Sequence, residues 1–313
     1  GNPKGKIVQD SIISILSWNI GYAGMGAETD FFYDGGKMVR PSRELNRQYF
    51  ESILAYLRSQ ETLDFILLQE VDKKAKRSYY TDQTADIRGI LTKHTSVFAK
   101  NYDVLFVPVP MHNPMGTVAG GMLSFSGYQP HESKRISFPG NYDWPTRLFM
   151  LKRCFIQQRF PCKNGKNLVV INTHNSAFDD GTLRLRQLEK IKETVLNEYQ
   201  HGNFVIVGGD WNMNPPGFDP GQIVNGDFSV VNPLGSIPED FMPLGWQWIY
   251  DPTKPTNREV VTTYFQGQTP TSVIDFFLLS PNVKSLSIET DDQSFRFSDH
   301  NPLKIKILLD FEL

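Results

Sequence analysis

Five apolar runs along the chain each end in a polar residue that can hold a metal ion or move a proton. The runs are SIISILSWN, LDFILLQE, KNLVVINTH, NFVIVGGDWN and the FRFSDH segment that precedes LKIKILL. The polar residues at their ends are Asn19, Glu70, His174, Asp210, Asn212, Asp299 and His300. Because a sheet can bring the ends of several strands to one edge, these side chains can meet in the fold. Such an oxygen-rich group with imidazoles beside it suits a hard divalent cation and a phosphate ester.

Most of these residues also have a purely structural interpretation. Asn19 before Gly21, and Asp210 after two glycines, are both typical of turns. His174, taken alone, favours a hydrogen-bonded structural histidine. Asp275 resists such an interpretation because the segment VIDFFLL surrounds it with apolar residues. A charge inside a buried strand must be paired or functional, so Asp275 joins the candidate site.

The elements that must position these residues are mostly strands. Strands are predicted at 12–20, 64–70, within 102–128, in a hairpin over 148–174, and at 203–209, 273–280 and 303–309. Amphipathic helices are predicted over 42–59 and 182–200, the second with Leu185, Leu188, Ile191, Val195 and Tyr199 facing inward. Because strands outnumber helices and their connections mix hairpins with crossovers, layered α and β structure with mixed sheets is expected, in a single domain over 1–313. Residues 213–262, rich in Pro, Gly and Asn, are expected to form a long irregular segment broken up by short elements.

The whole-chain properties are those of a globular protein. The 313 residues are 40% hydrophobic and 21% charged, and no apolar run approaches the roughly 20 residues that span a bilayer. The formal net charge of -2 weakens an assignment to nucleic-acid binding without excluding it. The densest basic cluster, over residues 73–77, is interpreted as a solvated loop.

Cysteine content and the first residue leave the compartment open. Cys154 and Cys162 are predicted to lie along one extended strand, too far apart for a disulfide, so two free thiols are expected. The chain starts at Gly1. Either an exported soluble protein with a removed signal peptide or a trimmed tag accounts for that start.

Taken in order, the motifs are more specific than any one of them. The segments are LSWNIG, ILLQEVD, VVINTHNSAFD, VIVGGDWNMNP, TTYFQGQTPTSVIDFFLLS and FSDHNPL. In these segments the chain resembles the endonuclease/exonuclease/phosphatase superfamily, which includes deoxyribonuclease I, apurinic endonucleases, neutral sphingomyelinases, inositol polyphosphate 5-phosphatases and deadenylases. The resemblance implies a deoxyribonuclease I-like, four-layer α/β sandwich of two stacked mixed sheets flanked by helices. It also implies a site at one edge of that sandwich.

The resemblance assigns a metal and its ligands. It implies that Glu70 is the principal ligand of Mg²⁺ or Mn²⁺, assisted by Asn19 and Asp299. Asp210 would orient or deprotonate the attacking water.

The remaining candidates are implied to act on the phosphate. Asn212 would hold a phosphate oxygen or assist a second metal. His300, oriented by Asp275, would stabilise the developing charge or act as a base, and His174 would bind phosphate or act as an acid. These roles agree with the chemistry, since an imidazole titrates near neutral pH and a carboxylate on its far nitrogen fixes the tautomer.

Two departures from family patterns bear on the substrate. The run Ser-Val-Ile-Asp over residues 272–275 stands where the 5-phosphatases carry Trp-Cys-Asp-Arg, which argues against that activity. The segment GGMLSFSGY lacks a basic residue that many members place there against phosphate. The loop over 22–42 is expected either to wall a pocket or to pack on itself, and the residues concerned are Tyr22, Phe31, Phe32, Tyr33, Lys37 and Arg40.

The sequence therefore predicts a divalent-metal-dependent phosphoester hydrolase, and favours a phosphodiester over a monoester. A nucleic acid or a phospholipid head group would supply the phosphate ester. The alternatives are a phosphomonoesterase acting on a small substrate and a non-catalytic binding module on the same fold.

Overall fold

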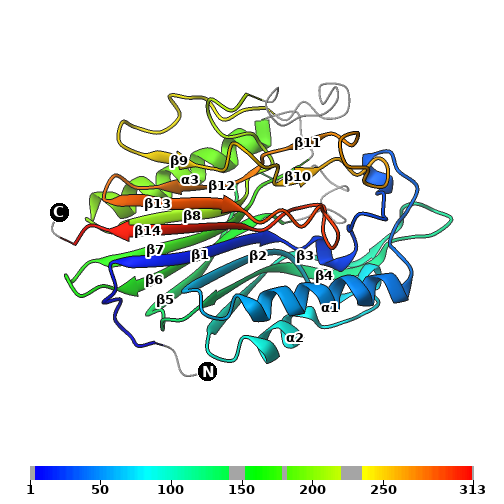
Figure 1. The fold of residues 1–313 in the computed structure, drawn as a ribbon, viewed down its shortest axis with the longest axis horizontal. Coiled ribbons are helices and arrows are strands. Elements are labelled where there is room, and N and C mark those ends of the chain that lie inside the picture. The colour runs from blue at the N-terminus through cyan, green and yellow to red at the C-terminus, as the bar shows by residue number, and fades with distance from the viewer. Residues whose placement is uncertain (1–3, 141–151, 178–181, 220–234, 312–313) are drawn as a thin grey trace.

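Two six-stranded mixed β-sheets face one another in the computed structural model, which describes residues 4–140, 152–177, 182–219 and 235–311. The first sheet has the order β13-β14-β1-β2-β4-β3 and the second β5-β6-β7-β8-β12-β9. Strands β1 and β2 are parallel, as are β7 and β8, while the other pairings in the two sheets are antiparallel. Figure 1 shows the strands of both sheets running along the long axis of the molecule.

The strands of the first sheet are β1 (Ile12–Asn19), β2 (Phe65–Ala75), β3 (Thr95–Val107), β4 (Gly116–Ser126), β13 (Val283–Thr290) and β14 (Leu303–Leu309). Those of the second are β5 (Glu132–Ser137), β6 (Cys154–Pro161), β7 (Asn167–His174), β8 (Phe204–Asp210), β9 (Gln247–Ile249) and β12 (Asp275–Leu279). A separate pair consists of β10 (Asn257–Arg258) and β11 (Thr271–Ser272). The helices are α1 (Arg43–Ser59), α2 (Gln83–Ile90) and α3 (Thr182–Gln200).

The two sheets and the helices bury three apolar layers. Side chains from both sheets, such as Phe65, Phe160 and Phe277, are fully buried between them. Helices α1 and α2 cover the outer face of the first sheet, and α3 covers the outer face of the second. Each fully buried Phe or Leu contributes roughly 1.5–3 kcal/mol, so this arrangement holds the strand ends in place. The predicted sandwich of two mixed sheets flanked by helices is confirmed.

Edge strands and one helix account for the main differences from the predicted elements. The sequence does not predict α2, β5 or β13. The β5 and β13 strands lie at sheet edges, where much of each strand is exposed and the apolar pattern is weak. Leu185 is 48% exposed, contrary to expectation, because it lies at the border of the stripe that α3 buries.

The interpretation of residues 73–77 as a solvated loop is wrong. Strand β2 continues to Ala75, and a 3-10 turn follows over Lys76–Ser78. Only Lys73 and Lys74 are well exposed, whereas Arg77 is buried. The reason is an ion pair within the fold, described below.

Two predicted segments lie partly outside the described residues. These are the start of the hairpin, over 148–151, and part of the irregular segment, over 220–234. The described part of 213–262 contains β9 and β10, in agreement with the expected short elements. Within the described chain, no helix is both long and apolar enough to cross a membrane.

Both cysteines are free, as expected, and both are buried. Cys154 begins β6 and Cys162 directly follows its end. Burial raises the pKa of Cys154 to about 11 and that of Cys162 to about 12, so both stay protonated thiols at neutral pH. We expect a thiol reagent to react slowly with the native protein and to count two thiols after denaturation without reductant. A count of zero would contradict this arrangement.

Candidate active site

Strand register places three candidate residues side by side at one edge of the second sheet. His174 at the end of β7 pairs with Asp210 at the end of β8, and Asp210 pairs with Asp275. Asp275 is the first residue of β12, so it lies at this edge rather than inside the strand. Gly209 has a φ of 149°, and a Cβ there would collide with the carbonyl of Thr173. A glycine is therefore required where β8 approaches β7 beside the site.

Glu70 reaches the same cavity from the first sheet through an irregularity in β2. The register of β2 on β4 shifts between Leu68 and Val71, and Glu70 has a φ of 54°. Such a bulge re-aims a side chain, and a left-handed φ at a non-glycine residue costs about 1–3 kcal/mol. The Glu70 side chain is 26% exposed and lines the cavity. The strained backbone thus turns a carboxylate toward the cavity.

Pairing of β14 with β1 brings Asp299 and His300 to the ends of the other strands. Ser17 pairs antiparallel with Leu303, so the residues just before β14 lie at the carboxyl end of β1. The Trp18 indole donates a hydrogen bond to the carbonyl of His300 at 2.8 Å. The segment is therefore fixed on the first sheet, while the His300 side chain reaches Asp275 of the second.

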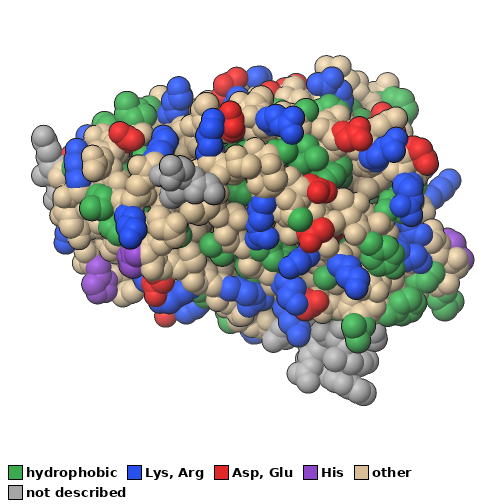
Figure 2. Space-filling model, turned by 90° about the horizontal axis from the view of Figure 1, so that it is seen from below, with side chains coloured by type: hydrophobic (Ala, Val, Ile, Leu, Met, Phe, Trp, Pro, Cys, Tyr) green, Lys and Arg blue, Asp and Glu red, His purple; other side chains and the backbone are tan. Residues whose placement is uncertain are grey.

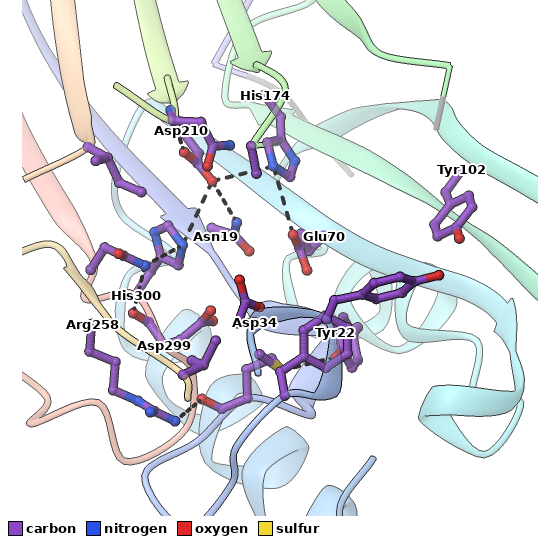
Figure 3. Close-up of a pocket in the computed structure, with 18 of the residues that line it drawn as sticks. Asn19, Tyr22, Asp34, Glu70, Tyr102, His174, Asp210, Arg258, Asp299 and His300 are labelled. Atoms are coloured by element: carbon purple, nitrogen blue, oxygen red, sulfur yellow. Dashed lines mark hydrogen bonds and ion pairs between the residues drawn. The ribbon is translucent and has the colours of Figure 1, made fainter. Parts of the chain in front are cut away.

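Asp210 is the centre of the polar contacts in the cavity (Figure 3). The Asn19 amide donates to Asp210 Oδ2 at 2.9 Å. His174 Nε2 lies 3.4 Å from the same oxygen, and His300 Nε2 lies 3.8 Å from it. His174 Nε2 also lies 3.8 Å from Glu70 Oε1, toward the other side of the cavity. Residues distant in sequence therefore converge on one carboxylate.

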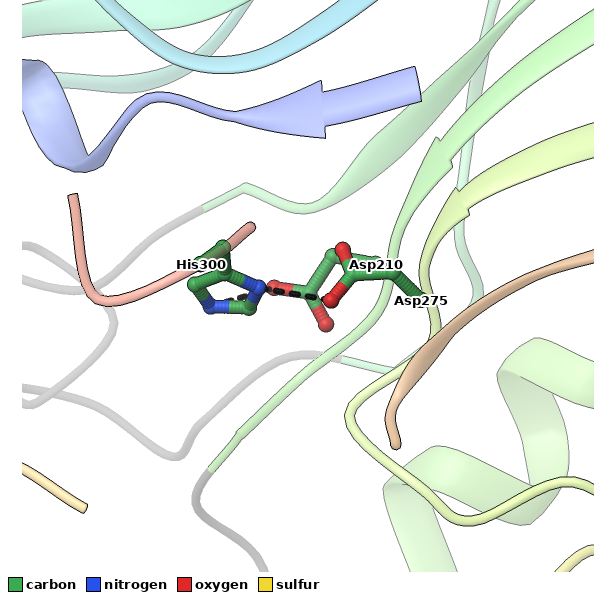
Figure 4. Close-up of side chains that lie close together, drawn as sticks. All are labelled: Asp210, Asp275 and His300. Carbon is green, nitrogen blue, oxygen red and sulfur yellow. Dashed lines mark hydrogen bonds and ion pairs between the residues drawn. The ribbon is translucent and has the colours of Figure 1, made fainter. Parts of the chain in front are cut away.

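Asp275 and His300 form a buried pair beside Asp210 (Figure 4). His300 Nδ1 lies 2.7 Å from Asp275 Oδ2, and both side chains are almost fully buried. Burial alone lowers the pKa of His300, but the Asp275 and Asp210 carboxylates raise it to about 10. Asn257, which the sequence did not single out, places its amide 3.1 Å from His300 Nε2. The two carboxylates thus favour the charged form of His300, and the contact with Asp275 fixes the orientation of its ring.

A left-handed backbone conformation and a hydrogen bond to Asp210 fix the position of Asn212. Its φ is 51°, and its backbone N–H donates to Asp210 Oδ1 at 2.9 Å. The Asn212 side-chain amide donates to the carbonyl of Asn175 at 2.9 Å. Asn212 lines the cavity beside Asp210.

Several carboxylates line one side of a cavity of about 320 Å³. Burial raises the pKa of Asp299, with the charge of Glu70 adding to the effect. Asp34 also lines the cavity, and burial together with the charges of Asp299 and Glu70 raises its pKa to about 7. Figure 3 shows Asp34, Glu70 and Asp299 on the side of the cavity away from Asp210. Negative groups that crowd together in this way fit a divalent cation, which prefers oxygen ligands.

Two groups of residues can be compared as metal ligands. Within the residues that the structure describes, donor atoms of Asp210, Asp275 and His300 come within 4.8 Å of one another. His300 Nδ1 in that group already contacts Asp275, and the two carboxylates hold the ring as a cation. Glu70 and Asp299 also offer carboxylate oxygens to the cavity, and the charges of His300 and Arg258 act on Asp299. Glu70 and Asp299, with Asn19 beside Asp210, therefore offer oxygen ligands separately from the Asp275–His300 pair.

Arg77 is a buried cation in the cavity wall that the sequence analysis missed. Its guanidinium donates two hydrogen bonds to Asp72, at 2.9 and 3.0 Å, and lies 3.7 Å from the centroid of the Tyr22 ring. Asp72 is fully buried and also accepts from Ser78 at 2.9 Å. In the sequence, this ion pair is indicated only by the five-residue spacing of Asp72 and Arg77.

Arg77→Met is expected to destabilise the protein by about 3 kcal/mol. The substitution leaves the Asp72 carboxylate buried without its counter-ion, and breaking a buried pair in this way is costly. Chemical denaturation would measure the change, with Arg47→Met as the control, since the Arg47–Glu51 pair on α1 is exposed. Equal stability of Arg77→Met and the wild type would contradict the pairing.

The loop over 22–42 both walls the cavity and packs on itself. Tyr22, Phe31 and Tyr33 line the cavity, whereas Phe32 packs on Tyr33 with 4.2 Å between ring centroids. Lys37 and Arg40 do not line the cavity. Each of the two alternatives left open by the sequence therefore describes part of the loop.

Arg258 anchors this loop to the rest of the fold. The buried guanidinium donates to the carbonyls of Met25, Gly26 and Thr29 at 2.8–3.1 Å. Arg258 also lines the cavity, together with Arg77 and Arg153. Basic groups therefore reach the cavity from segments other than GGMLSFSGY, where the sequence lacked one.

A buried polar link fixes the two sheets to each other next to the site. The Gln69 amide donates to Asn172 Oδ1 at 2.8 Å, and the Asn172 amide donates to the Leu68 carbonyl and to Ser124, each at 3.1 Å. Gln69 precedes Glu70 in the first sheet, and Asn172 lies two residues before His174 in the second. This link sets the spacing between the Glu70 and His174 sides of the cavity.

The sequence profile of the Endonuclease/Exonuclease/phosphatase family matches residues 16–300. The fold and the edge site agree with that match, so the chain belongs to this family, whose members are metal-dependent phosphoesterases. No curated protein sequence matches the chain.

Solved structures share the fold at low sequence identity. An endonuclease/exonuclease/phosphatase from Beutenbergia cavernae superposes with a TM-score of 0.61 at 16% identity, over 96% of this chain and 72% of that one. D. rerio TDP2 complexed with single-strand DNA product has a TM-score of 0.57 at 16% identity, over 95% and 99%. ANGEL2, a 2',3'-cyclic phosphatase, has a TM-score of 0.60 at 14% identity, over 96% and 95%. These similarities concern the fold.

Proposed function

We propose that this protein hydrolyses phosphodiesters by in-line attack of water, with Mg²⁺ or Mn²⁺ as its cofactor. The observation that carries the proposal is the convergence of Asn19, His174 and His300 on Asp210, with Glu70 across the same cavity. Both sheets contribute to this site, so we also propose that residues 1–313 act as one catalytic domain.

The cation would be held by Glu70 and Asp299, with the Asn19 side chain as the third ligand. When bound, it offsets the negative charge that develops on the phosphate oxygens. Asp299 lies where the crowded carboxylates need such compensation, because burial and Glu70 both raise its pKa.

Asp210 would orient the attacking water and accept its proton. Burial raises the pKa of Asp210 to about 7, although the charge of His300 opposes that rise. A base with a pKa near the working pH is well suited to such a transfer. The Asn19 amide and the Asn212 backbone N–H fix the two Asp210 oxygens, so the acceptor atom is held in place.

His300 and His174 would contact the phosphate. The His300 imidazolium, oriented by Asp275, would donate to a phosphate oxygen and stabilise its charge. His174 is buried, and burial lowers its pKa well below the usual value, so the ring is neutral and has one N–H to donate. Asn212, at the same edge, would hold a further oxygen.

The cavity wall favours a diester over a monoester. One side of the cavity is apolar and aromatic, including Phe31, Met115 and Val260. A second ester group can pack there, whereas a second phosphate charge would lose hydration against these apolar side chains. The names of two structural neighbours, a TDP2 with DNA product and a 2',3'-cyclic phosphatase, agree with phosphate-ester chemistry.

A substrate panel tests this function. It comprises bis(p-nitrophenyl) phosphate, p-nitrophenyl phosphate, plasmid DNA, RNA and sphingomyelin, each with Mg²⁺, with Mn²⁺ and with chelator. We expect metal-dependent turnover of at least one diester, faster than that of the monoester, and loss of turnover in Asp210→Asn. Faster monoester cleavage would favour a phosphomonoesterase, and the absence of metal-dependent turnover on every substrate would favour a binding module.

A further inference from the structure

Large apolar side chains stand exposed around the connection between β3 and β4. Leu105 and Met111 are each 91% exposed, Phe106 is 51% exposed and Val109 is 36% exposed. We call these four residues the apolar tip. Single exposed apolar residues are common, but four within seven positions form a patch that marks a contact with a partner or a membrane.

Hydrogen bonds fix the backbone of the apolar tip in a conformation that leaves its four side chains exposed to solvent. The Met115 N–H donates to the Val109 carbonyl at 3.0 Å, and Thr117 Oγ1 donates to the Leu105 carbonyl at 2.9 Å. Val107 and Met115 are buried beneath the tip and anchor it. The exposed side chains therefore belong to an ordered connection with an apolar base.

Three basic side chains lie beside the base of the apolar tip. Arg40 Nη2 donates to Asn113 at 3.3 Å, and Lys76 Nζ donates to the Pro114 carbonyl at 3.1 Å. Lys74 is exposed on β2 and pairs in register with Ala119 on β4. Figure 2 shows hydrophobic and basic side chains side by side at the right-hand end of the face drawn, the end where β3 and β4 meet in Figure 1.

We propose that the apolar tip inserts into the surface of an anionic lipid bilayer, with Arg40, Lys74 and Lys76 at the level of the lipid phosphates. A projecting apolar tip with cations behind it matches the two layers of such a surface, hydrocarbon beneath and negative charge above. A stable protein partner would need about 800 Å² of this molecule, far more than a single projecting turn provides.

Strand β3 and the connection that carry the apolar tip also contribute residues to the cavity wall. Tyr102 lies on β3 and Met115 lies at the end of the tip connection, and both line the cavity. Docking would therefore bring the cavity to the level of the lipid head groups. The consequence that a lipid phosphodiester is the substrate rests on the proposed function, whereas the docking does not.

Vesicle co-sedimentation tests the docking in the absence of hydrolysis. The wild type, with chelator present, is expected to bind vesicles of phosphatidylcholine mixed with phosphatidylglycerol, and to bind pure phosphatidylcholine more weakly. Leu105→Ser/Met111→Ser should weaken binding by roughly tenfold or more, because two apolar anchors are lost. Leu244→Ser is the matched control, since Leu244 is fully exposed elsewhere and should leave binding unchanged.

Several results would overturn the proposal. These are no binding by the wild type, equal binding by the double variant, or equal loss in the Leu244 control. A wild-type dimer in solution that the double variant abolishes, without vesicle binding, would instead make the tip an interface between copies. Thermal unfolding should be unchanged in the double variant, because both side chains are exposed.

A second measurement separates docking from catalysis. If the wild type turns over both bis(p-nitrophenyl) phosphate and a phospholipid in vesicles, the double variant should lose only vesicle turnover. Equal loss on both substrates would contradict a docking role for the tip. Failure of the wild type on every substrate of the panel would overturn the proposed function and leave vesicle binding as an independent result.

Discussion

Glu70→Gln is expected to reduce turnover of a phosphodiester by roughly 10³-fold and to abolish tight binding of Mg²⁺ or Mn²⁺. The substitution keeps the size of the side chain but removes the charge that would hold the cation. Stabilisation of developing charge by a metal amounts to several kcal/mol, and each ~1.4 kcal/mol corresponds to a tenfold change in rate. Turnover assays and calorimetry with each metal measure the two effects.

In the metal-free protein, the same substitution should leave the thermal stability unchanged or raise it. Glu70 adds to the negative charge around Asp299 and Asp34, so its neutralisation relieves repulsion. With chelator present, Glu70→Gln should therefore unfold at the same temperature as the wild type or at a higher one. Added metal should raise the melting temperature of the wild type only, because a ligand stabilises the state that it binds.

A control in the same cavity makes the result specific. Glu259 lines the cavity but lies beyond β10, outside the proposed ligand group. Glu259→Gln should bind metal as the wild type does. Equal metal affinity in Glu70→Gln and the wild type would remove Glu70 from the proposed role.

The strand ends were predictable because each is a local pattern. An apolar run that stops at a polar residue marks the end of a buried strand, and parallel strands align those ends. For this reason Asn19, His174 and Asp210 could be placed at strand ends before the fold was known. The predicted strand end at Glu70 is wrong, because β2 continues to Ala75. The apolar run around Asp275 indicated that its charge needs a partner, and the family resemblance implied that the partner is His300, which lies 2.7 Å away.

The parts that could not be predicted depend on contacts between distant segments. The left-handed φ of Glu70 arises from a register shift between β2 and β4, and no local signal marks it. Arg77 looked like part of a solvated basic run because its burial depends on Asp72 and on the Tyr22 ring. Asp34 reaches the cavity only because Arg258 anchors the loop that carries it.

Asp275→Asn is expected to reduce turnover by roughly 10²–10⁴-fold, the range typical of general acid–base contributions, with the fold intact. Among the charges that raise the pKa of His300, that of Asp275 has the largest effect. Its removal should therefore lower this pKa from about 10. The ring would then be less often charged and less firmly oriented when phosphate is bound. An NMR titration of His300 measures the shift, and an unchanged pKa would show that Asp275 does not support the imidazolium.

The double variant shows whether the two residues act together. His300→Ala should reduce turnover about as much as Asp275→Asn, and Asp275→Asn/His300→Ala should reduce it little further, because residues that act as a unit are not additive. His201→Ala, at the exposed end of α3, is the control and should keep full turnover. If the losses instead multiply in the double variant, the two residues act separately. The 2.7 Å contact would then be structural, and Asp275 would act in turnover through Asp210, its register partner on β8.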